Sequence, residues 1–336
     1  MKYPFLFFLF LATSVLFGQQ YKFKKIETKT TSTFRGLSIV DNKIAWLSGS
    51  QSRVGRSIDG GQTWEFIQVA GFDNLDFRSL YAFDDQRAIV ANAGSPAHIL
   101  LTTDAGKNWK EVYTNAHKDA FFDGIDFWND KEGMIYGDPI DGKMLVLLTI
   151  DGGLSWKEVT TSPQLEKGEA SFAASGTGIR CTNKNDVMIC TGGVVSRLWN
   201  STNKGENWTS ISTPIVQGEN ATGIFSFVYN INSLIIVGGD FQKEALNTNH
   251  NFYSLDRGKK WLTPTAPIRG YRECVEPIAK KIIVATGPSG TDISYDNGVN
   301  WKMLSDEKGL HVVRKARKGT LVIAAGGKGQ LFLIEL

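Results

Sequence analysis

The chain of 336 residues carries 37 Lys and Arg against 34 Asp and Glu, a formal net charge of +3 at pH 7. Such a nearly balanced charge excludes the strongly basic footprint that is typical of nucleic-acid-binding proteins. With 42% hydrophobic and 21% charged residues, the chain can bury a core and is not intrinsically disordered.

The first 18 residues have the pattern of a secretory signal peptide. Lys2 precedes an apolar run from Pro4 to Phe17, and Gly18 ends the run at a polar boundary. This run is shorter than the ~20 residues that a membrane-spanning helix needs. No cysteine lies at the junction, which disfavours a lipoprotein anchor. We therefore predict a signal peptide over residues 1–18, one mature domain over residues 19–336, no membrane span after cleavage, and a secreted or periplasmic location.

An eight-residue pattern, Ser/Thr-x-Asp-x-Gly-x-x-Trp, recurs six times along the mature chain, once with Asn in the acidic position. This is the BNR/Asp-box motif. A short acidic side chain can accept hydrogen bonds from its own turn amides, Gly takes a positive φ, and Trp buries a large apolar area over the hairpin. We predict a structural role for all six boxes, with Asp59, Asp104, Asp151, Asn203, Asp256 and Asp296 in the acidic position and Trp64, Trp109, Trp156, Trp208, Trp261 and Trp301 at the end.

The acidic positions of successive boxes are 40 to 53 residues apart, and each interval holds four short strand patterns. Four strands in about 45 residues make one blade of a β-propeller. After the sixth box three strands remain before the chain ends, whereas residues 21–27 match the strand that follows a box. We therefore predict an all-β, seven-bladed propeller that is closed by pairing of residues 21–27 with residues 330–335.

The three cysteines, Cys181, Cys190 and Cys274, are too few for a disulfide-built scaffold, and their spacing fits no zinc pattern. Cys181 and Cys190 flank a turn signal at residues 183–186, so both a disulfide and a pair of buried thiols stay open. The sequence also has no dinucleotide-binding glycine fingerprint, no CxxC pair and no haem pattern. We expect neither a cofactor nor a metal.

Charged residues recur near the start of the strand that would line the channel. Arg35, Arg78 and Arg272 each follow an aromatic residue there, and Asp123 holds the same place in the third unit. Such a ring would form an anion-attracting mouth, or it would pair with neighbouring carboxylates into ion networks that hold blades together; both interpretations stay open. With carboxylates from Gly-rich loops added, the candidate ligand-binding residues are Arg35, Arg78, Asp123, Asp138, Glu169, Asp240, Arg272, Asp292 and His311.

Longer phrases in the chain, among them FRGL, GDPIDGK, GEASFAASGTGI, GYREC and GPSGTDIS, resemble exported bacterial BNR/Asp-box proteins. These are related to the photosystem II stability and assembly factor of plants and cyanobacteria. The resemblance covers nearly the whole mature chain. It implies a non-enzymatic assembly factor with an arginine-rich binding patch. Bacterial relatives are often labelled oxidoreductases, but no residue pattern here supports that chemistry.

Two functions therefore stand side by side. The first is a binding or assembly-factor propeller that holds an anionic group of a protein or glycan partner at its channel mouth. The second is a carbohydrate-active hydrolase or lyase with Asp123, Asp138 or Glu169 as acid or base. A sialidase-like use of the arginines with Tyr271 matches weakly, because sialidases have six blades and an Ile-Pro after their early Arg, where this chain has Gly36 and Leu37.

Overall fold

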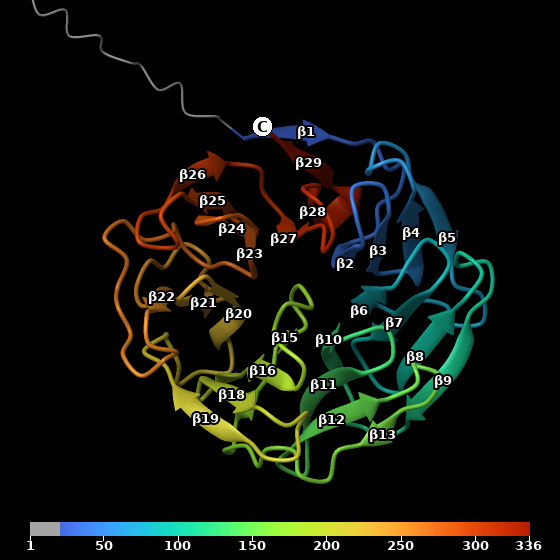
Figure 1. The fold of residues 1–336 in the computed structure, drawn as a ribbon, viewed down its shortest axis with the longest axis horizontal. Coiled ribbons are helices and arrows are strands. Elements are labelled where there is room, and N and C mark those ends of the chain that lie inside the picture. The colour runs from blue at the N-terminus through green and yellow to red at the C-terminus, as the bar shows by residue number, and fades with distance from the viewer. Residues whose placement is uncertain (1–20) are drawn as a thin grey trace, which may run out of the picture.

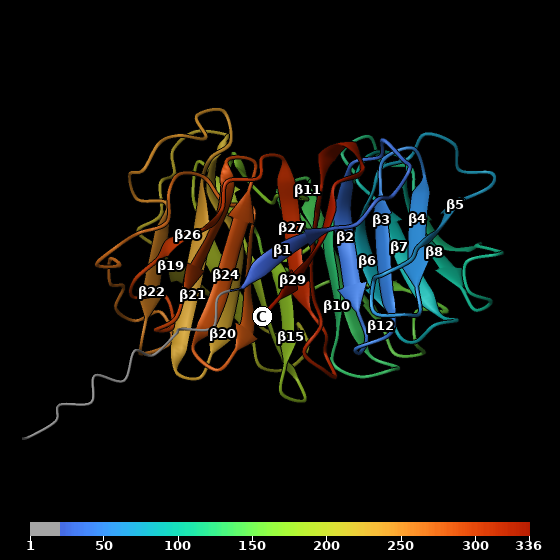
Figure 2. The same cartoon turned by 90° about the horizontal axis from the view of Figure 1, so that it is seen from above.

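The computed structural model describes residues 21–336, and the signal peptide predicted for residues 1–18 lies outside them. The strands form seven antiparallel sheets, six with four strands and one with five, which close into a ring (Figure 1). Figure 2 shows that the strands run roughly along the short axis of this ring. Within residues 21–336, no helix is long and apolar enough to cross a membrane. The predicted all-β, seven-bladed propeller is confirmed.

The blades are numbered along the chain, and each is given from the channel outward. Blade 1 holds β2 (Phe34–Ile39), β3 (Ala45–Gly49), β4 (Arg53–Ser57) and β5 (Glu65–Gln68). Blade 2 holds β6 (Phe77–Ala82), β7 (Ala88–Asn92), β8 (Ala97–Thr102) and β9 (Lys110–Asn115). Blade 3 holds β10 (Phe122–Phe127), β11 (Gly133–Ile140), β12 (Lys143–Thr149) and β13 (Lys157–Glu158). Blade 4 holds β15 (Ile179–Thr182), β16 (Asp186–Cys190), β18 (Arg197–Ser201) and β19 (Thr209–Ser212).

Blade 5 holds β20 (Thr222–Asn230), β21 (Ser233–Asp240) and β22 (Asn251–Ser254), with β17 (Gly192–Gly193) and β14 (Glu169–Ala170) added beside β20. Blade 6 holds β23 (Cys274–Ala279), β24 (Ile282–Gly287), β25 (Gly290–Ser294) and β26 (Lys302–Ser305). Blade 7 holds β27 (Leu310–Lys315), β28 (Val322–Gly326), β29 (Leu331–Glu335) and β1 (Lys22–Lys25), with the short 3-10 turn η1 (Gly327–Gly329) before β29.

Blade 7 is assembled from both ends of the described chain. Strand β1 pairs antiparallel with β29, so Phe23 lies opposite Ile334 and its ring centroid is 5.6 Å from that of Phe332. Figure 1 shows β1 at the outer rim beside β29. The predicted closure by residues 21–27 and 330–335 is therefore confirmed. It pairs an outer strand edge that would otherwise be open.

Burial falls from the channel side to the rim. The second strands β3 and β7 are buried at every position, whereas the residues of the outer strands β5 and β9 are exposed or half-buried. Apolar side chains of neighbouring blades pack between the sheets; Phe34 and Leu37 of blade 1 share a cluster with Val313 of blade 7. Because each sheet buries apolar side chains against the sheets on both sides, every blade needs two neighbours.

The Asp boxes close the turns between the third and fourth strands. In the first box, Ser57 donates to Asp59 at 2.9 Å, the Thr63 amide donates to the same carboxylate at 3.0 Å, and the Trp64 indole donates to Gly61 O at 2.9 Å. The box glycine packs on the preceding blade. At Gly153, with φ of +86°, a Cβ would lie 2.2 Å from Ile89 Cδ1, so only glycine fits.

The cysteines are free thiols. In the hairpin of β15 and β16, Cys181 lies opposite Val187, and Cys190 pairs with Leu198 of β18. The register therefore separates Cys181 from Cys190; both are reduced thiols, with Cys190 buried and Cys181 half-buried.

Candidate functional site

The inner strands begin at one mouth of the channel, where most of the predicted site residues lie. Arg35, Arg78 and Asp123 each sit at a β-bulge, and His311 occupies the equivalent bulge of β27. In blade 6 that position belongs to Glu273. Gly287 abuts the backbone of Arg272 as Gly49 abuts that of Phe34, so Arg272 takes the place of a core aromatic residue. The structure thus shifts the sequence alignment by one residue in blade 6.

A loop of residues 171–178 lies across this mouth, which we call the plugged mouth. Ala174 O accepts a hydrogen bond of 2.7 Å from Arg35 Nη1, and Ser175 Oγ donates to Glu273 O at 2.8 Å. Arg35 Nη1 also lies 2.8 Å from Glu273 Oε2, which is 2.7 Å from His311 Nδ1. Burial opposes the charge of Glu273, but these two neighbours hold its pKa below the usual range. Arg35 and His311 are therefore bound to protein groups.

Arg272 is fully buried, and within residues 21–336 its side chain bonds only to residues 271–292 of blade 6 and the segment before it. Its Nη2 lies 2.6 Å from Asp292 Oδ2, and its Nη1 donates to Tyr271 O and Ser289 Oγ. Asp292 also binds Arg269 at 3.0 Å. This arrangement fits the alternative in which a predicted arginine holds one blade together.

Glu169 is buried between blades 4 and 5. Its carboxylate accepts hydrogen bonds from Arg197, Thr191 Oγ1 and Trp199 Nε1, and although burial opposes its charge, these donors lower its pKa. Both oxygens of this carboxylate accept hydrogen bonds from protein donors, so Glu169 is not placed to act as an acid or base on a substrate.

Arg78, Asp123 and Asp138 lie near one another at the plugged mouth, close enough for Asp138 and Arg78 to act on the charge of Asp123, whereas Asp240 pairs with its own neighbour. Arg78 binds its neighbour Asp76 at 2.7 Å, and Asp240 lies 3.6 Å from Lys243. Asp138 Oδ1 accepts a hydrogen bond from the Ser171 amide in the central loop. Asp123 is fully buried, neither carboxylate oxygen has a hydrogen-bond partner among residues 21–336, and burial raises its pKa well above the usual range. Each of the three predicted arginines is thus held by its own carboxylate.

A second ring of aligned residues lies three positions further along the inner strands, at the opposite mouth. Each member pairs with the second strand in an equivalent register, as Arg314 pairs with Ile323, Asp126 with Met134 and Arg180 with Met188. All seven line one cavity of about 450 Å³. The members are Ser38, Tyr81, Asp126, Arg180, Val228, Glu276 and Arg314.

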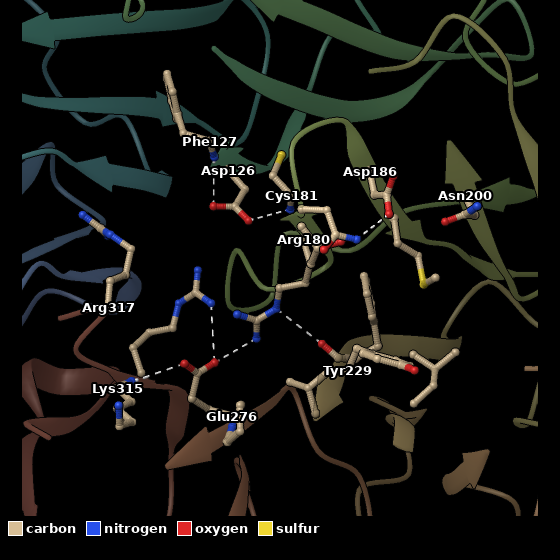
Figure 3. A pocket seen from close by; sticks show the side chains of 18 of the residues that line it. Asp126, Phe127, Arg180, Cys181, Asp186, Asn200, Tyr229, Glu276, Lys315 and Arg317 are labelled. Atoms are coloured by element: carbon tan, nitrogen blue, oxygen red, sulfur yellow. Dashed lines mark hydrogen bonds and ion pairs between the residues drawn. The ribbon is translucent and has the colours of Figure 1, made fainter. Parts of the chain in front are cut away.

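We call this cavity the arginine groove, because Arg180, Arg314 and Arg317 line it together with the ring. From the channel it continues between blades 4 and 5, past Asn200 and Tyr229. Figure 3 shows Asn200 and Tyr229 on one side of Arg180, and Lys315 and Arg317 on the other. The groove is therefore elongated, with a basic inner end.

Two arginines of the groove share one carboxylate. Glu276 Oε2 accepts a hydrogen bond of 2.9 Å from Arg180 (Figure 3) and lies 3.6 Å from Arg314 Nη1. The Arg314 side chain, which is 16% exposed, donates no hydrogen bond to residues 21–336. Burial lowers its pKa, and so does the nearby charge of Arg180. Arg314 therefore keeps unused donors at the cavity.

The other charged groups of the groove are more fully used. Asp126 accepts hydrogen bonds from the backbone amides of Phe127 and Cys181, at 2.9 and 2.8 Å. Arg317 donates to Ser38 Oγ at 2.9 Å and lies 4.4 Å from the centroid of the Tyr81 ring. Within residues 21–336, no three His, Cys, Asp or Glu side chains gather as a metal site would require.

Sequence reasoning missed this second ring although the same repeat logic would have found it. Arg314 lies in HVVRK, Arg180 in GIRC and Asp126 in GIDF, each at the equivalent position of its inner strand. The predicted site used the residue that follows the aromatic residue at the start of each inner strand, whereas the open cavity lies at the other end of these strands.

Comparison with known proteins agrees with this architecture. The family model of the photosynthesis system II assembly factor YCF48 matches residues 17–119. Among solved structures, the chain is similar to YCF48 bound to a D1 peptide, with a TM-score of 0.69 and 15% identity, covering 95% of this chain and 98% of that one. YCF48 from Cyanidioschyzon merolae gives a TM-score of 0.65 at 15% identity, covering 93% and 98% of the two chains.

A carbohydrate-active protein shares the fold as well. The GH74 xyloglucanase from Xanthomonas campestris has a TM-score of 0.58 at 13% identity, and the match covers 92% of this chain but 60% of that one. No curated protein matches the sequence. At these identities the structural likenesses establish the fold alone.

Proposed function

We propose that this chain, a BNR-type propeller related to the photosystem II assembly factor, is a non-catalytic binding protein that holds an extended, acidic segment of a partner protein in the arginine groove. The observation that carries the proposal is Arg314, whose unused donors line an open cavity beside Arg180. Arginine guanidinium groups bind carboxylates through two parallel hydrogen bonds, which gives both affinity and orientation.

The shape of the groove favours a chain-like ligand. Its basic inner end lies at the channel, and Met188, Ile211, Leu234 and Tyr229 line the part between blades 4 and 5. A peptide with an acidic side chain at the basic inner end and apolar side chains along the apolar part would be complementary to the groove. The solved complex of YCF48 with a D1 peptide supports peptide binding by a propeller of this kind, for that protein.

The carbohydrate-active alternative rests on the fold likeness to the xyloglucanase. Two of its predicted acid or base residues are not accessible to a substrate. Asp123 is fully buried, and Glu169 is bound by Arg197. In the groove, Glu276 and Asp126 already accept hydrogen bonds from Arg180 and from backbone amides. A catalytic carboxyl must be free to exchange a proton with substrate, so these contacts favour binding over hydrolysis.

Fluorescence anisotropy with labelled ten-residue peptides tests the proposal. We expect an acidic peptide with interspersed apolar residues to bind with strong salt dependence, and a Lys-containing counterpart to bind at least tenfold more weakly. Arg314→Ala should weaken acidic-peptide binding at least tenfold. Arg78→Ala, which removes the same charge at the plugged mouth, should change it less than twofold. Equal binding of the two peptides, or equal effects of the two substitutions, would refute the proposal.

Export is part of this proposal, because the partner must be in the same compartment. The motivation is the apolar run that precedes Gly18. Fractionation of the native cells followed by N-terminal sequencing tests it, with a mature protein that begins at residue 19 expected outside the cytoplasm. Full-length protein in the cytoplasmic fraction would contradict it. A glycan-hydrolysis panel run on the same preparation checks the enzymatic alternative.

A further inference from the structure

A second cavity, of about 480 Å³, lies at the seam where blade 7 meets blade 1. Its walls come from the connection between β1 and β2, the turn between β3 and β4, and the η1 turn. Two hydrogen bonds tie these walls together. Thr28 Oγ1 donates to Gly329 O at 2.7 Å, and the Gly329 amide donates to Ser32 O at 2.8 Å. The cavity is therefore built into the closure of the ring, away from the arginine groove.

Four basic side chains line this seam cavity, and Glu27 is the one carboxylate among its lining residues in the described chain. Lys25 lies 3.9 Å from Glu27, with both side chains largely exposed. Lys29, Arg53 and Lys328 form no ion pair with residues 21–336. The excess positive charge of the cavity is thus left without a partner.

Arg53 adds an independent observation. Its Nε is buried and has no hydrogen-bond partner among residues 21–336. A buried donor without an acceptor is costly, and charged donors cost more than neutral ones. Lys29 and Lys328 also hold left-handed backbone conformations, with φ of +54° and +55°. Non-glycine residues in this region are strained, and such strain gathers at ligand clamps.

We propose that the seam cavity binds a small organic phosphate, with the doubly charged phosphate between Lys29, Lys328 and Arg53. Three chain segments bring these cations to one place, and a dianion would satisfy all of them with charge-assisted hydrogen bonds. The cavity volume of about 480 Å³ exceeds what a lone phosphate fills, and Ile26 and Phe66 supply apolar wall for an organic portion. A ligand bound there would stabilise the closed ring, because blade 7 contributes Lys328 and blade 1 contributes Arg53 to the same cavity.

The probe is phenyl phosphate, titrated into the full mature chain at constant ionic strength and followed by calorimetry and thermal unfolding. We expect saturable binding with a rise in unfolding temperature, and at least tenfold weaker binding of inorganic phosphate. Lys29→Gln combined with Lys328→Gln should weaken phenyl phosphate binding at least tenfold. Both lysines are exposed, so this variant should fold, and without ligand it should unfold at no lower temperature than the parent because like charges are removed.

Two control variants separate this site from others. Lys259→Gln removes an exposed charge on blade 5, and Arg314→Ala disables the arginine groove; both should bind phenyl phosphate within twofold of the parent. Retained binding in Arg314→Ala also keeps this test distinct from the test of peptide binding. Absence of saturable binding, an equal temperature rise with sodium chloride, or an equal loss in Lys259→Gln would overturn the proposal. Equal affinity for inorganic phosphate would overturn the organic part of it.

Discussion

Arg314 approaches Glu276 at 3.6 Å, and the same carboxylate oxygen already accepts a hydrogen bond of 2.9 Å from Arg180. One negative charge thus faces two guanidinium groups. Glu276 also accepts a hydrogen bond from the Lys315 amide at 3.3 Å, so it orients the arginine groove as well as partly neutralising it. Peptide affinity and fold stability therefore depend on this carboxylate in opposite directions.

We expect Glu276→Gln to strengthen acidic-peptide binding by threefold or more while lowering the free energy of unfolding by about 2 kcal/mol. The loss follows from leaving two poorly hydrated guanidinium groups without their counter-charge, discounted for their partial exposure. Urea unfolding and fluorescence anisotropy measure the two effects. Glu65→Gln, at an exposed carboxylate 3.9 Å from Arg56 Nη1, serves as the control and should change neither. Weaker peptide binding in Glu276→Gln would contradict the groove assignment.

The buried Asp123 carboxyl should make the protein less stable as pH rises. Its folded pKa is raised by burial and by Asp138, while nearby Arg78 opposes the shift only in part. The folded state therefore holds its proton longer than the unfolded chain. This stabilisation is full below the unfolded pKa of about 3.9 and is lost as pH rises towards the folded pKa.

Asp123→Asn should remove that pH dependence. Across the window above pH 4, the variant should gain stability relative to the parent with a slope of up to ~1.4 kcal/mol per pH unit. Urea unfolding at half-unit pH steps measures this difference. In Asp59 burial opposes the charge, but the turn hydrogen bonds lower the pKa of the carboxyl, so Asp59→Asn should lose stability by an amount that is constant above about pH 5 and shrinks as pH falls below about 4. Parallel profiles for parent and Asp123→Asn would show that the buried carboxyl has an ordinary pKa.

Removing the N-terminal strand should destabilise the ring far more than an ordinary truncation. A mature chain beginning at residue 27 lacks β1 and the buried side chains Tyr21 and Ile26. Lost burial of two such residues costs about 4 kcal/mol, and the exposed edge of β29 invites association. Thermal unfolding and size-exclusion chromatography test this, with deletion of the exposed Leu336 as the control. An unchanged unfolding temperature would mean that β1 does not close the ring.

The fold was predictable because the Asp box repeats a turn whose chemistry is local. Ser57, Asp59 and Trp64 bond within their own eight residues, so the pattern survives in sequence whatever surrounds it. The seventh blade followed from counting strands at the two ends, which needs no knowledge of side-chain contacts.

The site was harder to predict because it depends on which end of each inner strand is open. The aromatic before Arg35 marks the end that the loop of residues 171–178 covers, through Ala174 and Ser175. Nothing local in that loop shows that it crosses the channel. In blade 6, Tyr271 precedes Arg272 as Phe34 precedes Arg35, but the residue equivalent to Arg35 is Glu273. Long-range packing thus determines both which mouth is covered and which residue of blade 6 is equivalent to Arg35.

The last prediction separates the two interpretations of the predicted arginines. Arg272 is fully buried, and its removal would leave Asp292 buried with the partly exposed Arg269 as its remaining cation, so Arg272→Ala should cost about 3–5 kcal/mol of unfolding free energy. Arg78, whose side chain is 32% exposed, makes a surface pair with Asp76, so Arg78→Ala should cost less than ~1 kcal/mol. Urea unfolding of both variants measures the contrast, and acidic-peptide binding should stay within twofold of the parent in Arg78→Ala and in whatever fraction of Arg272→Ala remains folded. A stable Arg272→Ala variant that loses peptide binding would return the ligand site to the plugged mouth.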